Sequence, residues 1–203
     1  QIAGARVLLV AAGLFVRSAD NAAAFPKGLD PEGVALTSMD LFSAGYDRDR
    51  GQQFFERLAT EAAGLPGVRS VGLARRVPLG FGGTSSTSLE VPGHVAAAGE
   101  SPYGLFNVVS PGYFRTVRTP VLKGREFEAG DRTRSRLVGV INETMARLYY
   151  AGREPLGATF LLGGDAIEIV GVVQDSRFRD LSEAPAPWFY LPLAQRYRPD
   201  MTL

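Results

Sequence analysis

An apolar run of ten residues near the start of the chain constrains its organisation more than any other feature. Residues 7–16 read VLLVAAGLFV, apolar on every face of a helix, and Arg17, Ser18 and Asp20 follow directly. Ten helical residues rise about 15 Å, half of the roughly 30 Å that a bilayer core requires. Two interpretations are open: the outer half of a membrane helix that begins upstream, or a helix buried in a soluble core.

The lack of an amphipathic pattern favours the membrane helix. A signal peptide is the third interpretation, but no Ala-x-Ala cleavage site follows at a suitable distance from a charged segment. We therefore expect residues 1–25 to be the C-terminal part of a first transmembrane helix and its exit, and residues 26–203 to form the folded domain. At the other end, residues 198–203 predict the beginning of a new strand.

The composition predicts a folded chain and excludes several classes of function. Of the 203 residues, 45% are hydrophobic and 21% are charged, which suits one domain or two closely packed subdomains. The 22 basic and 21 acidic residues leave a net charge of +1, so we expect no nucleic-acid partner. There is no cysteine, and the one histidine, His94, follows Pro-Gly in a predicted surface turn. We expect no metal site, no cofactor and no Ser-His-Asp triad.

The first half of the sequence predicts a strand-helix-strand unit. A strand is expected over residues 34–41, followed by a helix that Asp47 or Asp49 caps and Gly64 ends. A strand over residues 68–74 would complete the unit. Residues 80–88 are rich in Gly, Ser and Thr and predict a flexible polar loop, and strands follow at 87–91 and 103–109.

The second half repeats this order of elements. We expect Ser110 to cap a short helix over residues 112–117, a strand at 120–122, a turn at 123–125, and Phe127 as an anchor of the following loop. A strand at 137–141 then leads to a helix at 143–150 that Asn142 caps. A hairpin over residues 158–173 turns at Gly163-Gly164, and a last strand covers 188–191. The pattern predicts an α+β fold with helices on one face of a mixed sheet.

Few residues suggest chemistry. Ser85, Ser86, Asp131 and Asp175 are candidates for a hydrolase, but no base for a serine nucleophile accompanies them. No Gly-Lys-Ser or Gly-Lys-Thr occurs, so the chain has no Walker A phosphate loop. We assign no catalytic, cofactor-binding or metal-binding residue, and the sequence predicts a non-enzymatic domain.

Two polar groupings have a structural explanation that we prefer. Asn142-Glu143 is explained by helix capping and the helix dipole. Four basic residues that lie close in sequence predict a solvated charged face, with contact to lipid headgroups or a partner as the alternative. These residues are Arg115, Arg118, Lys123 and Arg125.

Short motifs carry a resemblance to a known family. In order they are residues 14–18 (LFVRS), 108–115 (VVSPGYFR), 122–127 (LKGREF), 140–143 (VINE), 155–157 (PLG), 168–173 (EIVGVV) and 190–193 (YLPL). Together they resemble the periplasmic core domain of MacB-like ABC transporter permeases over nearly the whole chain. Within that family the chain is most similar to the duplicated permeases of soil acidobacteria.

The resemblance implies an architecture and a place in the cell. The fold would be a strand-helix-strand, porter-like subdomain with an inserted β-rich subdomain, which we expect within residues 77–175. The domain would lie on the periplasmic side of the cell inner membrane, tethered by membrane helices. Those helices, and not this domain, would contact the cytoplasmic ATPase subunit.

The resemblance also implies a function, which is mechanotransmission: ATP-driven movement of the membrane helices would shift the external domains during export. The full permease would be a homodimer and would meet a periplasmic partner protein. A ligand-sensing domain of a membrane receptor is the alternative from a different class, because it too would lie beside a membrane helix.

Overall fold

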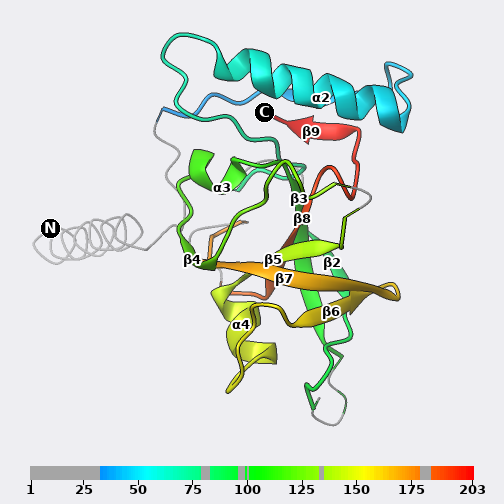
Figure 1. Ribbon diagram of the computed structural model, residues 1–203, viewed down its shortest axis with the longest axis vertical. Helices are drawn as coiled ribbons and strands as arrows, with labels where there is room; N and C mark the ends of the chain where they lie inside the picture. The colour runs from blue at the N-terminus through cyan, green and yellow to red at the C-terminus, as the bar shows by residue number, and fades with distance from the viewer. Residues whose placement is uncertain (1–32, 79–82, 96–98, 100, 133–134, 179–183) are drawn as a thin grey trace, which may run out of the picture.

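The computed structural model describes residues 33–78, 83–95, 99, 101–132, 135–178 and 184–203, and its helices and strands are shown in Figure 1. The predicted membrane segment at residues 1–25 lies outside these ranges. Within them, no helix combines the length and the hydropathy of a bilayer span. The elements are β1 (Ser38–Asp40), α2 (Arg48–Ala63), β2 (Ser85–Ser88), β3 (Tyr103–Val109), α3 (Tyr113–Thr116), β4 (Val121–Gly124), β5 (Val138–Asn142), α4 (Glu143–Tyr149), β6 (Thr159–Leu162), β7 (Asp165–Val173), β8 (Trp188–Pro192) and β9 (Asp200–Thr202).

The main sheet is mixed and strongly curled. Its strands follow the order β2-β3-β8-β5-β7-β4, and β6 pairs with β7. β3 is parallel to β8 and β5 is parallel to β7, whereas β5 and β8 are antiparallel. Glu90, just after β2, pairs with Leu161 of β6 through backbone hydrogen bonds of 2.7 and 3.2 Å. The sheet therefore curls until its two sides meet, and the predicted α+β class is confirmed.

A second layer consists of β1, β9 and α2. β1 and β9 form an antiparallel pair, and β9 lies directly beneath α2 (Figure 1). Ala74 joins this pair to the main sheet, since it forms bridges to both Thr202 of β9 and Val109 of β3. Under α2 a small core gathers around the fully buried Phe55 and Met201. The strand predicted to begin at residue 198 is present as β9.

Side chains of β8 divide the remaining core between the two faces of the sheet. Phe189 and Leu191 belong to the cluster that includes α4, whereas Trp188 and Tyr190 belong to the cluster that includes α3. Successive residues of a strand point to opposite faces, so α3 and α4 cover opposite faces. The expectation that helices cover one face is wrong. The sheet is buried on both sides, because each of the five residues of β8 is buried.

Several local predictions are confirmed. Asp47 caps α2 by accepting a hydrogen bond from the N–H of Arg50 at 2.8 Å. Asn142 caps α4 through the N–H of Met145 at 2.9 Å. Gly163 and Gly164 turn the β6–β7 hairpin with φ of 59° and 89°, values that glycine adopts without strain. Phe127 is 2% exposed in the core beside α3 and anchors its loop as expected.

Four predicted elements differ in the structure. Residues 68–74 form no strand, and only Ala74 pairs. The strand predicted at 87–91 is present as β2 but begins two residues earlier, at Ser85, because β3 supplies a partner for the backbone of residues that were predicted as loop. Lys123 and Gly124 continue β4 instead of turning, since β7 pairs with them. Ser110 does not cap α3. Its hydroxyl accepts from the N–H of Leu73 at 2.8 Å, and α3 begins after Gly112.

Candidate functional site

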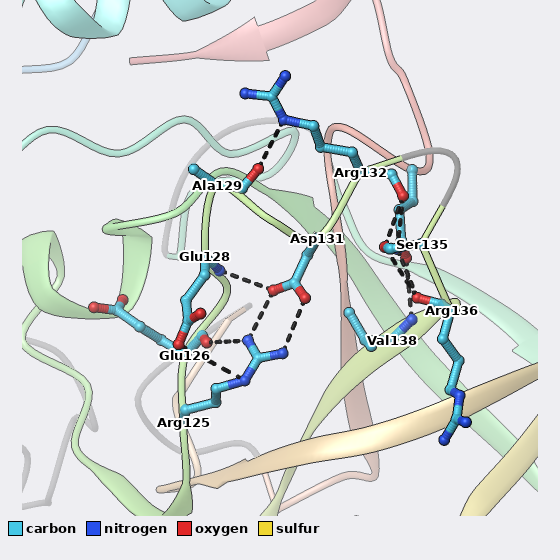
Figure 2. A network of polar contacts seen from close by, with 10 residues as sticks. Arg125, Glu126, Glu128, Ala129, Asp131, Arg132, Ser135, Arg136 and Val138 are labelled. Carbon is cyan, nitrogen blue, oxygen red and sulfur yellow. Dashed lines mark hydrogen bonds and ion pairs between the residues drawn. The ribbon is translucent and has the colours of Figure 1, made fainter.

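The loop between β8 and β9, residues 193–199, contains a buried glutamine that holds a distant part of the chain. Gln195 is 6% exposed, and its Oε1 accepts from the N–H of Val138 at 3.0 Å. Its Nε2 donates to the carbonyl of Arg136 at 2.9 Å, to the hydroxyl of Ser135 at 3.0 Å and to the carbonyl of Arg132 at 3.2 Å. Figure 2 shows these four residues converging at the start of β5. One side chain therefore fixes the entry into β5.

The same loop contacts α2. Gln52 donates to the carbonyl of Ala194 at 3.0 Å, and Arg48 donates to the carbonyl of Gln195 at 3.3 Å. Tyr197 lies against Phe55, with ring centroids 6.4 Å apart. The helix is thus attached to the loop by hydrogen bonds as well as by the apolar core beneath it.

A third connection reaches the β6–β7 hairpin. The guanidinium of Arg196 forms an ion pair with the carboxylate of Asp165, the first residue of β7. The two side chains are 33% and 51% exposed, so the pair by itself contributes little to stability. We call the loop residues Ala194, Gln195, Arg196 and Tyr197 the junction, because they connect α2, the entry into β5 and the hairpin.

The loop before β5 is closed by a bidentate ion pair. Arg125 donates to the two carboxylate oxygens of Asp131 at 2.8 and 2.9 Å, and the N–H of Glu128 donates to the same carboxylate at 2.8 Å (Figure 2). Burial disfavours ionisation of Asp131, but the Arg125 and Glu128 hydrogen bonds and the Arg125 charge outweigh it, so the pKa of Asp131 lies below 3.8. This ion pair between Arg125 and Asp131, which we call the fork, holds the loop beside the segment that Gln195 binds.

A second polar network surrounds the start of α4. The amide oxygen of Asn142 accepts from the N–H groups of both Met145 and Trp188 at 2.9 Å. Asp175 accepts from the N–H of Thr144 at 3.0 Å and from its hydroxyl at 2.7 Å, and it also binds the amide of Asn142. These contacts join α4 to the segment that follows β7 and to the first residue of β8. Asn142 and Asp175 therefore have a structural role here.

The structure does not assemble the candidate hydrolase residues into a site. Ser85 and Ser86 lie on β2, Asp131 is bound by Arg125, and Asp175 is bound at α4. In the described part of the chain no hydrogen bond joins either serine to either aspartate. His94 lies in a turn, as predicted, with its ring 5.1 Å from that of Tyr149. No group of three or more His, Asp or Glu among the described residues is arranged to hold a metal ion.

The predicted basic face is divided by the fold. Lys123 pairs with Glu154 at 2.9 Å and Arg125 with Asp131, whereas Arg115 pairs with Glu126 at 2.9 Å. Arg115 and Arg118 line a groove between α2 and α3 that does not include Lys123 or Arg125. The four charges therefore belong to three separate environments rather than to one surface.

Sequence reasoning missed the junction. Gln195 is a single neutral polar residue after an apolar stretch, and no motif distinguishes it from an exposed loop glutamine. Its partners lie 57 to 63 positions earlier in the chain. The only signal is indirect, since the motif at residues 190–193 ends directly before the junction.

Comparisons with known proteins identify the family. The family of MacB-like periplasmic core domains matches residues 7–202. The periplasmic region of MacB from Actinobacillus actinomycetemcomitans is 16% identical, covers 86% of this chain and 75% of its own, and has a TM-score of 0.52. This similarity shows the fold. No curated protein matches the chain.

Two further solved structures are more distant. The extracellular domain of the noncanonic ABC-type transporter YknZ from Gram-positive bacteria is 19% identical, with coverage of 82% and 80% and a TM-score of 0.47. A domain of a putative permease from Porphyromonas gingivalis is 16% identical, with coverage of 68% and 61% and a TM-score of 0.42. The family match over residues 7–202 places the chain among the MacB-like periplasmic core domains, as an extracytoplasmic domain of an ABC-type transporter permease.

Proposed function

We propose that the domain transmits ATP-driven movement across the cell inner membrane during export, and that it does so as one mechanical unit without catalysing a reaction. The observation that supports this proposal is the junction, in which one short loop is bound to α2, to the entry into β5 and to the β6–β7 hairpin. A cytoplasmic ATPase would act on it through the membrane helices. No finding favours the alternative of a ligand-sensing receptor domain.

A domain that transmits displacement must keep its parts in a fixed arrangement under load. Close-packed interiors transmit strain, and a buried polar network whose members are satisfied adds rigidity. Gln195 meets this requirement, because its amide NH₂ has three acceptors and its oxygen has a donor. Removing it leaves buried backbone groups unpaired, each at a cost of about 1–3 kcal/mol. The loop would then no longer link α2 firmly to the sheet.

The experiment uses the intact permease with its ATPase in lipid nanodiscs. This domain lacks cysteine, and any cysteine elsewhere in the permease or its ATPase is first replaced. Arg57→Cys on α2 and Leu148→Cys on α4 then place spin labels at two exposed positions of the domain. Labels on Arg57→Cys alone report the distance between two domains in the expected homodimer. We expect ATP with vanadate to change that distance, while the distance between the two labels within one domain stays constant.

The variant Gln195→Met keeps the size of the side chain and removes its hydrogen bonds. We expect it to broaden the distance distribution within the domain and to weaken the nucleotide-dependent shift. Gln53→Met, exposed on α2, is the control and should leave both unchanged. A domain that does not move on nucleotide binding would refute mechanotransmission. Turnover of generic esters or phosphoesters that Ser85→Ala or Ser86→Ala abolishes would refute the absence of catalysis.

A further inference from the structure

A groove runs between the end of α2, residues 33–36 and α3. It measures about 810 Å³, within the range of small-molecule sites, and it is lined mainly by apolar residues. Three of its large apolar side chains are unusually open to solvent: Leu36 and Leu65 are 59% exposed, and Val68 is 39% exposed. α3 lies beneath the end of α2 that forms one wall (Figure 1). Contiguous exposed apolar side chains of this kind mark a binding surface.

The groove continues into a second hollow of about 440 Å³. Arg69, Ser70, Val71 and Arg115 line both hollows, so two arginines lie where the hollows meet. Arg118 contributes a third guanidinium to the larger groove. Among the described residues that line either hollow there is no Asp or Glu. We call the groove and the second hollow together the trough. The trough therefore combines an apolar channel with positively charged arginine side chains.

The arginines have capacity to bind an anion. Arg115 is paired with Glu126 through one 2.9 Å hydrogen bond, and its side chain is 70% exposed. A guanidinium has five N–H donors, so the contact to Glu126 leaves donors for a second carboxylate. Burying an uncharged apolar ligand here would gain nothing from these charges, whereas an acidic head beside them forms charge-assisted hydrogen bonds.

We propose that this trough binds a single-chain carboxylate amphiphile, with the acidic head at Arg69 and Arg115 and the apolar chain along Leu36, Leu65 and Val68. A free amphiphile fits the volume of the groove and the sign of its charge. This inference goes beyond the proposed function and does not depend on it, because a domain can bind such a ligand whether or not it transmits movement.

The test is isothermal titration of the full chain, in detergent-free buffer, with dodecanoate below its critical micelle concentration. We expect saturable binding that strengthens roughly fourfold for each methylene from octanoate to dodecanoate, as burial of the chain requires. Dodecanol, which has no charge, should bind at least about tenfold more weakly. Binding that is independent of chain length or of the head group overturns the proposal.

Variants locate the ligand. The double variant Arg69→Gln/Arg115→Gln should weaken dodecanoate about tenfold and leave dodecanol unchanged, whereas Arg57→Gln, outside both hollows, should have no effect. Leu65→Asn should weaken both ligands, and Leu148→Asn, 49% exposed on α4, should weaken neither. Because Leu65 is exposed, its variant keeps the test informative if the double variant fails to fold.

Three further outcomes would refute the assignment. If the chain binds phosphatidylglycerol vesicles but not monomeric dodecanoate, the trough is a membrane contact. If it binds only an acidic amphipathic peptide, it is a protein contact. If the four variants bind dodecanoate equally, binding occurs elsewhere on the chain, and the trough is not the site.

Discussion

Gly51 lies inside α2, where a glycine normally weakens a helix. Replacement of glycine by alanine at an exposed interior position of a helix stabilises it by about 1 kcal/mol. In this protein the space beside Gly51 is occupied by Tyr197 of the junction. A Cβ atom at residue 51 would lie 1.9 Å from the Tyr197 Oη and 2.7 Å from its Cζ. We therefore predict that Gly51→Ala destabilises the protein.

The magnitude follows from two opposing contributions. Overpacking of a filled site costs about 1–3 kcal/mol, and the helix preference of alanine returns about 1 kcal/mol. We expect a net loss of about 1–2 kcal/mol, which corresponds to a fall of roughly 2–8 °C in Tm for a chain of this size. Relief requires movement of Tyr197, which packs against Phe55, so the substitution would also disturb the junction.

Urea unfolding of Gly51→Ala, Tyr197→Ala and the double variant measures the coupling. In the Tyr197→Ala background the obstacle is gone, so Gly51→Ala should stabilise by about 0.5–1 kcal/mol. Gln53→Ala, exposed on the same helix, is the control and should change the free energy of unfolding by only a few tenths of a kcal/mol. If Gly51→Ala stabilises the protein while Tyr197 is present, that result would contradict the packing of Tyr197 beside Gly51 of α2.

Two predictions concern the neighbouring loop. The native pKa of Asp131 lies below its ordinary value of 3.8, so in acid the unfolded state binds more protons than the folded state. The ionised Asp131 therefore stabilises the folded protein above about pH 4, and this contribution is lost as the pH falls further. Unfolding measured from pH 7 to pH 2 should show this loss, and Asp131→Asn should remove it; an unchanged acid dependence contradicts the role of the fork. Gly171→Ala should cost more than about 3 kcal/mol or prevent folding, because its Cβ would lie 2.1 Å from the carbonyl oxygen of Arg125, which is backbone and cannot yield. Gly130→Ala has nothing within 4 Å and should change the stability by less than about 0.5 kcal/mol; equal effects at the two glycines would contradict the close approach.

Predictions from the sequence succeeded where a feature depends on neighbours along the chain. The caps at Asp47 and Asn142 each bind an N–H three residues later, and the Gly163-Gly164 turn needs only two positive φ values. Predictions from the sequence failed where a distant segment supplied the hydrogen-bonding partner. Ser110 is a residue type that often caps helices, but its hydroxyl accepts a hydrogen bond from the N–H of Leu73, 37 residues away. Ser85 and Ser86 have the composition of a loop, but pairing with β3 makes them part of a strand.

The amino-acid sequence by itself determined the α+β class, most of the elements, the family resemblance and the lack of a recognisable catalytic set, because these depend on local pattern and on residue types. Only the tertiary structure decided which faces the helices cover, how the sheet curls, where Gln195 is buried and which arginines line the trough. Each of these depends on contacts between residues that are far apart in the chain. Such contacts form because burial brings the segments together, and a sequence pattern does not specify the partner of a buried polar side chain.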